Sequence, residues 1–124
     1  MRKYVKPIAI VNSNVAEGVY AASGTGGNGV TISASSMTIT RNQADGYGEA
    51  YFLLNMAGQK PNNFKVKIIY NTEITDSWGD GANKEVGSNY VILAWYAAPD
   101  TVKVTVHVSN GMISELAVQS IEIV

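Results

Sequence analysis

The chain has 124 residues, 46% of them hydrophobic, with 9 basic and 10 acidic side chains and a net charge of −1. This length suits one domain, and the composition excludes both intrinsic disorder and the basic excess typical of nucleic-acid-binding proteins. With no cysteine and one histidine, the sequence has no means of forming a disulfide, a zinc–thiolate site or a cluster of histidine ligands.

The first 29 residues differ in character from the rest. Residues 1–24 carry three basic side chains and one acidic side chain, a charge of +2, whereas residues 25–124 carry six and nine, a charge of −3. A run of small residues, 21–29, follows and is typical of a linker or a processing site. The apolar stretch Ile8–Val11 is too short for a Sec signal or a membrane span. We therefore expect a leader or extension over residues 1–29 and one domain over residues 30–124.

Two stretches near the start, residues 4–7 (YVKP) and 15–24 (VAEGVYAASG), carry a resemblance to known proteins. They resemble the N-termini of small exported proteins of anaerobic gut bacteria of the clostridial type, and are similar to double-glycine leaders. The resemblance covers roughly a fifth of the chain. It implies cleavage after Ser23 and Gly24 and export, independent of Sec, to the cell surface or the medium. The alternative is that residues 4–11 form an ordinary edge strand.

Strand signals begin at Val30. Val occurs 14 times and Ile 11 times against 4 Leu, which favours strands, and no segment shows the periodicity of an amphipathic helix. The apolar alternation changes parity near Ser35 and Ser36, which predicts a bulge. Residues 49–56 (EAYFLLNM) read as a strand buried on both faces, residues 64–70 as a half-exposed strand, and residues 90–97 (YVILAWYA) as a central strand that buries Trp95.

The last third of the chain has the clearest alternation. Val102, Val104, Val106 and Val108 are predicted to face inward, which leaves His107 on the solvated side. Asn110-Gly111 predicts a hairpin that returns as a final strand over residues 113–124. Six or seven strands at intervals of about 8–12 residues predict an all-β fold: an antiparallel β-sandwich of immunoglobulin-like or carbohydrate-module-like architecture.

The most distinctive segment is residues 76–83 (DSWGDGAN), which we predict to be a loop. Asp76, Asp80 and Asn83 offer the hard oxygen ligands that calcium prefers. The alternative is a tight turn in which these side chains bond their own backbone. The segment resembles the DS(Y/W)GDGWNG signature of bacterial extracellular β-domains, with Ala82 in place of the second tryptophan. Calcium is the one cofactor that the sequence suggests.

Two aromatic residues, Trp78 and Tyr47, are predicted to lie on loops. Exposed aromatic rings stack on sugar rings or anchor protein interfaces. Alternatively, each ring plugs one end of the core. We expect Trp78 and Tyr47 to form a ligand-binding site.

Catalysis has little support in the sequence. It contains no G-x-S-x-G segment and no phosphate-binding loop. A carboxylate pair such as Asp76 and Asp80 serves glycoside hydrolysis only within a cleft, which is hard to build from a chain of this length. We therefore expect an exported, non-catalytic bacterial recognition domain that binds a glycan or a host protein such as an immunoglobulin.

Two alternatives stay open. One is a self-assembling surface protein whose extension, residues 3–11, adds as a strand to a neighbour and forms a homo-oligomer. The other is a secreted antagonistic protein.

Overall fold

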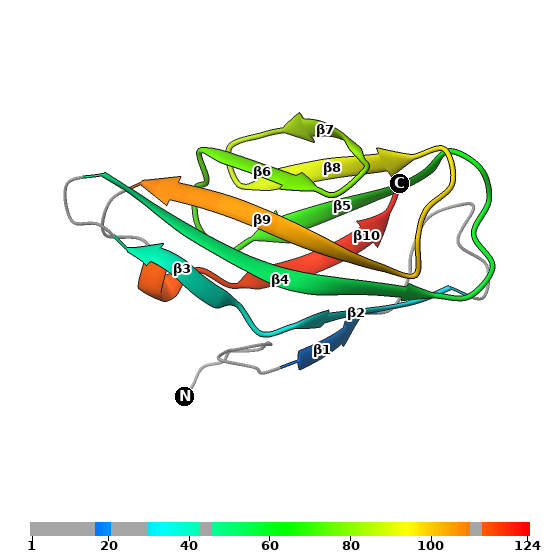
Figure 1. The fold of residues 1–124 in the computed structure, drawn as a ribbon, viewed down its shortest axis with the longest axis horizontal. Coiled ribbons are helices and arrows are strands. Elements are labelled where there is room, and N and C mark those ends of the chain that lie inside the picture. The colour runs from blue at the N-terminus through cyan, green and yellow to red at the C-terminus, as the bar shows by residue number, and fades with distance from the viewer. Residues whose placement is uncertain (1–16, 21–29, 43–45, 110–112) are drawn as a thin grey trace.

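A computed structural model describes residues 17–20, 30–42, 46–109 and 113–124, which form a sandwich of two antiparallel sheets (Figure 1). Sheet A contains β1 (Glu17–Tyr20), β2 (Thr31–Ser35), β3 (Thr38–Asn42), β4 (Tyr47–Ala57), β6 (Asp76–Gly79) and β9 (Thr101–Ser109). Sheet B contains β5 (Phe64–Tyr70), β7 (Asn83–Val86), β8 (Tyr90–Trp95) and β10 (Val118–Ile123), and a short 3-10 turn, η1 (Ile113–Glu115), precedes β10. The predicted all-β antiparallel sandwich is confirmed.

The described residues contain ten strands rather than the six or seven predicted. The additional strands are short and lie in segments that the sequence suggested were linkers or loops, such as β1, β6 and β7. In the part of the chain that the structure describes, no helix has the length and apolar character needed to cross a membrane.

Strands β2 and β3 lie one after the other along the same edge of β4. Three residues separate Ala34 from Thr38, whereas only two separate their partners, Leu54 and Tyr51. The β2–β3 segment therefore holds one residue more than the strand it pairs with. This is the bulge predicted near Ser35 and Ser36, and it explains why the apolar parity changes there.

The core lies between the sheets and consists of alternate residues of the long strands. The four valines of β9 face inward as predicted, and Trp95 is buried. The prediction that residues 49–56 are buried on both faces is wrong, because β4 alternates and Leu53 is 43% exposed. Sheet A packs against sheet B on one face only. The apolar and aromatic residues at odd positions of β4 therefore lie on the outer face of sheet A.

The predicted hairpin between β9 and the last strand is also wrong. Asn110 and Gly111 lie outside the described residues, but β10 pairs with β5 of the other sheet. Strand β9 has no free edge for β10, because β4 and β6 occupy its two sides. The chain instead crosses between the sheets through η1. Ile113 packs so closely over Gly48 that a Cβ added there would lie 2.7 Å from the Ile113 Cβ.

A buried polar bridge joins the two sheets. The Ser77 hydroxyl of β6 donates to the Thr105 carbonyl oxygen at 2.9 Å and lies 2.9 Å from the Tyr70 hydroxyl of β5. Burial raises the pKa of Tyr70, while the hydrogen bond to Ser77 opposes this in part. The phenol therefore stays protonated, and it donates to Ser77 because the Ser77 proton is already given to the Thr105 carbonyl.

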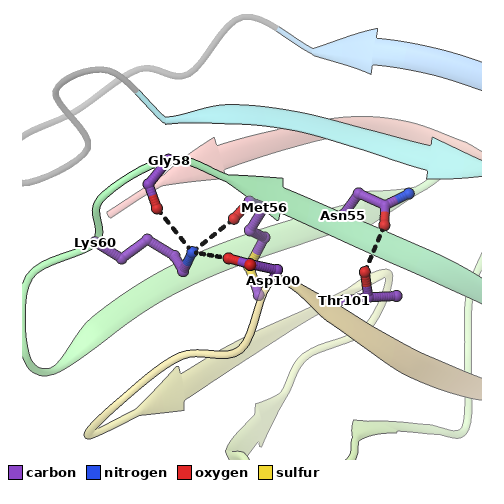
Figure 2. A network of polar contacts seen from close by, with 6 residues as sticks. All are labelled: Asn55, Met56, Gly58, Lys60, Asp100 and Thr101. Atoms are coloured by element: carbon purple, nitrogen blue, oxygen red, sulfur yellow. Dashed lines mark hydrogen bonds and ion pairs between the residues drawn. The ribbon is translucent and has the colours of Figure 1, made fainter.

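A second polar feature, the Lys60 clamp, closes one end of the sandwich and consists of Lys60, Met56, Gly58 and Asp100 (Figure 2). The Lys60 ammonium donates to the carbonyl oxygens of Met56 at 2.7 Å and Gly58 at 3.0 Å. It also forms an ion pair with Asp100 at 2.8 Å, although the Lys60 side chain is only 6% exposed. The clamp ties the loop after β4 to the start of β9.

Strand β1 falls within the predicted leader. Its residues pair with β2 from Glu17 opposite Ser35 to Tyr20 opposite Ile32. Ser23 and Gly24, the predicted cleavage position, lie outside the described residues. The boundary at residue 29 and the processing of the chain stay predictions.

Candidate functional site

The two predicted ligand-binding aromatics lie on strands rather than on loops. Tyr47 begins β4 and is opposite Ser109, and Trp78 lies in β6 opposite Thr105. The loop prediction failed because the flanking glycines and acidic residues suggested turns, whereas both segments find a partner in β9. Both side chains lie on the outer face of sheet A, on opposite sides of β9.

His107 joins the two rings into one aromatic row: Tyr47, His107 and Trp78. The His107 ring centroid lies 4.6 Å from that of Tyr47, with an interplanar angle of 32°, and 4.9 Å from that of Trp78, at 74°. The sequence predicts His107 on the solvated side, and it does lie on the outer face. Its side chain is nevertheless only 23% exposed, because a ring flanks it on each side.

Three cationic side chains cover the aromatic rings on this face. Arg41 lies 4.6 Å from the ring centroid of Tyr47, and Lys84 lies 5.5 Å from that of Trp78. Lys103 lies 4.7 Å from the ring of Tyr51, the residue two positions beyond Glu49 on β4. At exposed sites such contacts contribute about 0.5–1 kcal/mol each.

A line of charged residues crosses the sheet beside the rings. In register, Arg41 of β3 is opposite Glu49 of β4, and His107 of β9 is opposite both Glu49 and Asp76 of β6. The Glu49 carboxylate lies 3.6 Å from His107 Nε2. Polar groups that can bond hydroxyls therefore lie directly against the aromatic row.

Asp76 has two donors at one carboxylate oxygen. Lys84 Nζ and the backbone N–H of Ser77 each lie 2.8 Å from Oδ1. Partial burial raises the pKa of Asp76, but these two hydrogen bonds and the positive charges of Lys84 and His107 outweigh it. The net result is a pKa below the ordinary value.

The predicted calcium ligands are spread over two strands of different sheets and the turn between them. Asp76 begins β6, Asp80 lies in the turn and Asn83 begins β7. The Asp76 carboxylate accepts a hydrogen bond from the Ser77 backbone N–H, as in the alternative interpretation, and forms an ion pair with Lys84. Across the described ranges, no three or more His, Cys, Asp or Glu residues lie close enough to hold a metal. Calcium binding stays a prediction.

The sequence missed His107, Lys84, Arg41 and Glu49 as members of this site. The alternation of β9 could have placed His107 on the outer face. It could not place His107 between Tyr47 and Trp78, because these residues precede it by 60 and 29 positions.

The sequence matches no family model, and no curated protein matches it. Solved structures that are similar include the chitin-binding domain of a chitinase from Pyrococcus furiosus in crystal form. It has 20% identity and a TM-score of 0.41, over 77% of this chain and 99% of that one. They also include the solution structure of the chitin-binding domain of hyperthermophilic chitinase from the same organism. It has 22% identity and a TM-score of 0.36, over 71% of this chain and 85% of that one. Because both TM-scores are below 0.5, these similarities do not indicate the ligand of this chain, which has to be inferred from its own surface.

Proposed function

We propose that this protein is a non-catalytic recognition domain that binds a glycan on the outer face of sheet A, through the aromatic row. The observation that carries the proposal is the convergence of Tyr47, His107 and Trp78 from three adjacent strands onto one face. Glu49 and Asp76 lie beside these rings and can accept hydrogen bonds from sugar hydroxyls. Aromatic faces with polar neighbours suit the apolar C–H faces and polar rims of sugars.

A glycan is favoured over a host protein because of where the rings lie. We expect a protein interface to use loop tips, whereas these rings lie on the outer face of sheet A, with Trp78 on its edge strand, β6. The rings do not share one plane, since Trp78 and His107 make an angle of 74°. A single sugar chain, which can bend to follow such a surface, therefore fits better than the flat face of a crystalline polymer.

The ligand has to displace the cations that cover the rings. Lys84 and Arg41 are long side chains on the surface, and each contact with its ring contributes about 0.5–1 kcal/mol at an exposed site. A well-packed aromatic contact with a ligand contributes about 2 kcal/mol or more at the centre of an interface. The exchange therefore favours the ligand.

The test is a binding screen followed by calorimetry. The protein is screened against insoluble polysaccharides, chitin among them, and soluble oligosaccharides, and the Kd of the best soluble ligand is measured. We expect Trp78→Ala and Tyr47→Ala each to weaken binding at least about tenfold, which corresponds to about 1.4 kcal/mol.

The matched control is Tyr96→Ala. Tyr96 is 72% exposed and follows β8 of sheet B, away from the aromatic row. It should bind with unchanged Kd. Equal losses in all three variants, or no glycan binding at all by the intact protein, would count against the proposal. Binding of a host protein that needs Trp78, with no glycan bound, would favour the protein-ligand alternative instead.

The place of action that we propose is the cell surface or the medium, on the strength of the leader-like residues 15–24. The test is the intact mass of the native protein in cells and in culture supernatant. A supernatant species that begins at Thr25 supports export and cleavage. A full-length species found only inside cells contradicts both.

A further inference from the structure

Strand β1 lies at one edge of sheet A. It pairs with β2 alone in sheet A, over four residue pairs, and contacts β10 of the other sheet. Strand β2 is fixed independently: its other edge pairs with β4, and Ile32 and Ala34 are buried in the core. The edge that β1 covers is therefore in place whether or not β1 is present.

The connection between the two strands is longer than a hairpin needs. Nine residues, four of them glycine, separate Tyr20 from Val30. Two adjacent antiparallel strands are usually joined by two to five residues. Fully extended, nine residues span about 30 Å, enough to reach beyond the chain's own sheet edge.

We propose that β1 is an exchangeable strand, which pairs with β2 of a second copy of this chain. The same four residue pairs form within one chain or between two, so the exchange gains and loses no contact of the strand itself. The local concentration of copies then decides whether β1 pairs with its own chain or with another. A nine-residue tether gives an effective concentration in the millimolar range, so the strand stays on its own chain in dilute solution. It exchanges where copies are crowded side by side.

This proposal is independent of the glycan site, but it requires the uncleaved chain, because cleavage after Gly24 would remove β1. It concerns the edge of sheet A rather than its outer face, and it differs from strand addition by residues 3–11, which lie outside the described residues. It makes the second copy the partner and names the register: Val19 of one copy is opposite Ser33 of the other.

The absence of native cysteine makes the register directly testable. Opposite residues of an antiparallel pair have Cβ atoms about 4.5–5.5 Å apart, close to the separation that a disulfide bridges. Three full-length proteins are made: Val19→Cys, Ser33→Cys and the double variant. The two single variants are mixed under oxidising conditions, and the products are identified by intact mass and peptide mapping.

We expect the double variant to form an internal disulfide in dilute solution. The mixture of single variants should form a heterodimer, joined by a disulfide between position 19 of one copy and position 33 of the other. Its yield should rise at least severalfold from about 10 μM to about 1 mM. The control replaces Ser33→Cys by Lys65→Cys, an exposed position on the outer face of sheet B, and should give only the background yield.

Two results would overturn the proposal. In the first, the double variant closes internally but the mixture gives no more heterodimer at about 1 mM than the Lys65→Cys control. Strand β1 then stays on its own chain. In the second, neither the double variant nor the mixture forms a disulfide between positions 19 and 33, so the pairing that the exchange requires does not form.

Discussion

Two lysines of this protein, Lys60 and Lys84, differ in burial and in the partners of their ammonium groups. Lys60 is 6% exposed and has three oxygen partners, two of them backbone carbonyls. Lys84 is 43% exposed and has one carboxylate, that of Asp76, and the ring of Trp78. The first ammonium is almost buried and bonds three oxygens, one of them the partly buried Met56 carbonyl, so it belongs to the structure. The second covers the ring of Trp78, so it belongs to the proposed glycan site.

The difference predicts opposite outcomes for the two lysines. Removing a buried donor leaves its acceptors without a partner and costs their full desolvation. Removing an exposed cation costs little, because solvent screens an exposed ion pair and replaces its hydrogen bonds. The following variants test this contrast, from the largest expected effect to the smallest.

Lys60→Met should have the largest effect on stability. The substitution keeps an unbranched side chain, one atom shorter, but leaves the Met56 and Gly58 carbonyls without their donor. We expect the free energy of unfolding to fall by about 1–3 kcal/mol, chiefly through the partly buried Met56 carbonyl, measured by urea denaturation. Lys65→Met, at an exposed position of β5, is the control and should change it by less than about 0.5 kcal/mol. Equal losses of stability from the two substitutions would show that Lys60 contributes no more to folding than an exposed lysine.

Lys84→Ala should act on binding and not on folding. It uncovers the Trp78 ring, so we expect affinity for a neutral glycan to rise about two- to fivefold, the equivalent of the cation–ring contact that the ligand no longer displaces. The control is Lys67→Ala, which removes a cation 4.5 Å from the Tyr90 ring on sheet B and should leave Kd unchanged. A weaker affinity after Lys84→Ala would mean that the ammonium itself contacts the ligand.

Asp100→Asn separates the charge of the Lys60 clamp from its hydrogen bonds. The Asp100 side chain is 83% exposed, so its ion pair with Lys60 is largely screened. We expect a loss of less than about 1 kcal/mol, well below that of Lys60→Met. A loss as large as that of Lys60→Met would show that the ion pair, and not the two carbonyl bonds, holds the loop.

The pH dependence contributed by Asp76 should be the smallest effect. Its pKa is lower in the folded protein, so its contribution to stability is present above the unfolded-state pKa of about 3.9 and is lost as the pH falls through the lower folded value. Because the side chain is 39% exposed, screening keeps this contribution below about 1 kcal/mol. Asp76→Asn should flatten the urea-denaturation stability profile below about pH 4 relative to the unchanged protein. If the free energy of unfolding changed with pH equally in both proteins below about pH 4, Asp76 would not contribute to the pH dependence.

The sequence predicted features that depend on neighbouring residues. The alternation of β9 places each valine correctly, and the change of parity at Ser35 and Ser36 is the observed bulge. Both are local, because successive side chains of a strand alternate between its faces. The sandwich follows from the composition and spacing of such strands.

Features that depend on strand order could not be predicted in the same way. The apolar residues of β4 do not reveal whether a second layer covers both of its faces, so Leu53 was misplaced. Asn110-Gly111 is a local hairpin signal, but it carries no information on the occupied edges of β9. Tyr47 and Trp78 were found as candidates from their exposed, glycine-rich surroundings. The row that they form with His107 exists only because β4, β9 and β6 lie side by side.

The passage of the chain from β6 to β7 has a mechanical consequence. Strand β6 belongs to sheet A and β7 to sheet B, with only the turn at residues 80–82 between them. Ser77, beside Trp78, is bonded to Tyr70 of sheet B, and Trp95 of sheet B donates to the Asp80 carbonyl. A force applied to Trp78 is thus resisted by both layers. Detaching the edge strand β6 requires breaking its bonds to sheet B as well as its four residue pairs with β9.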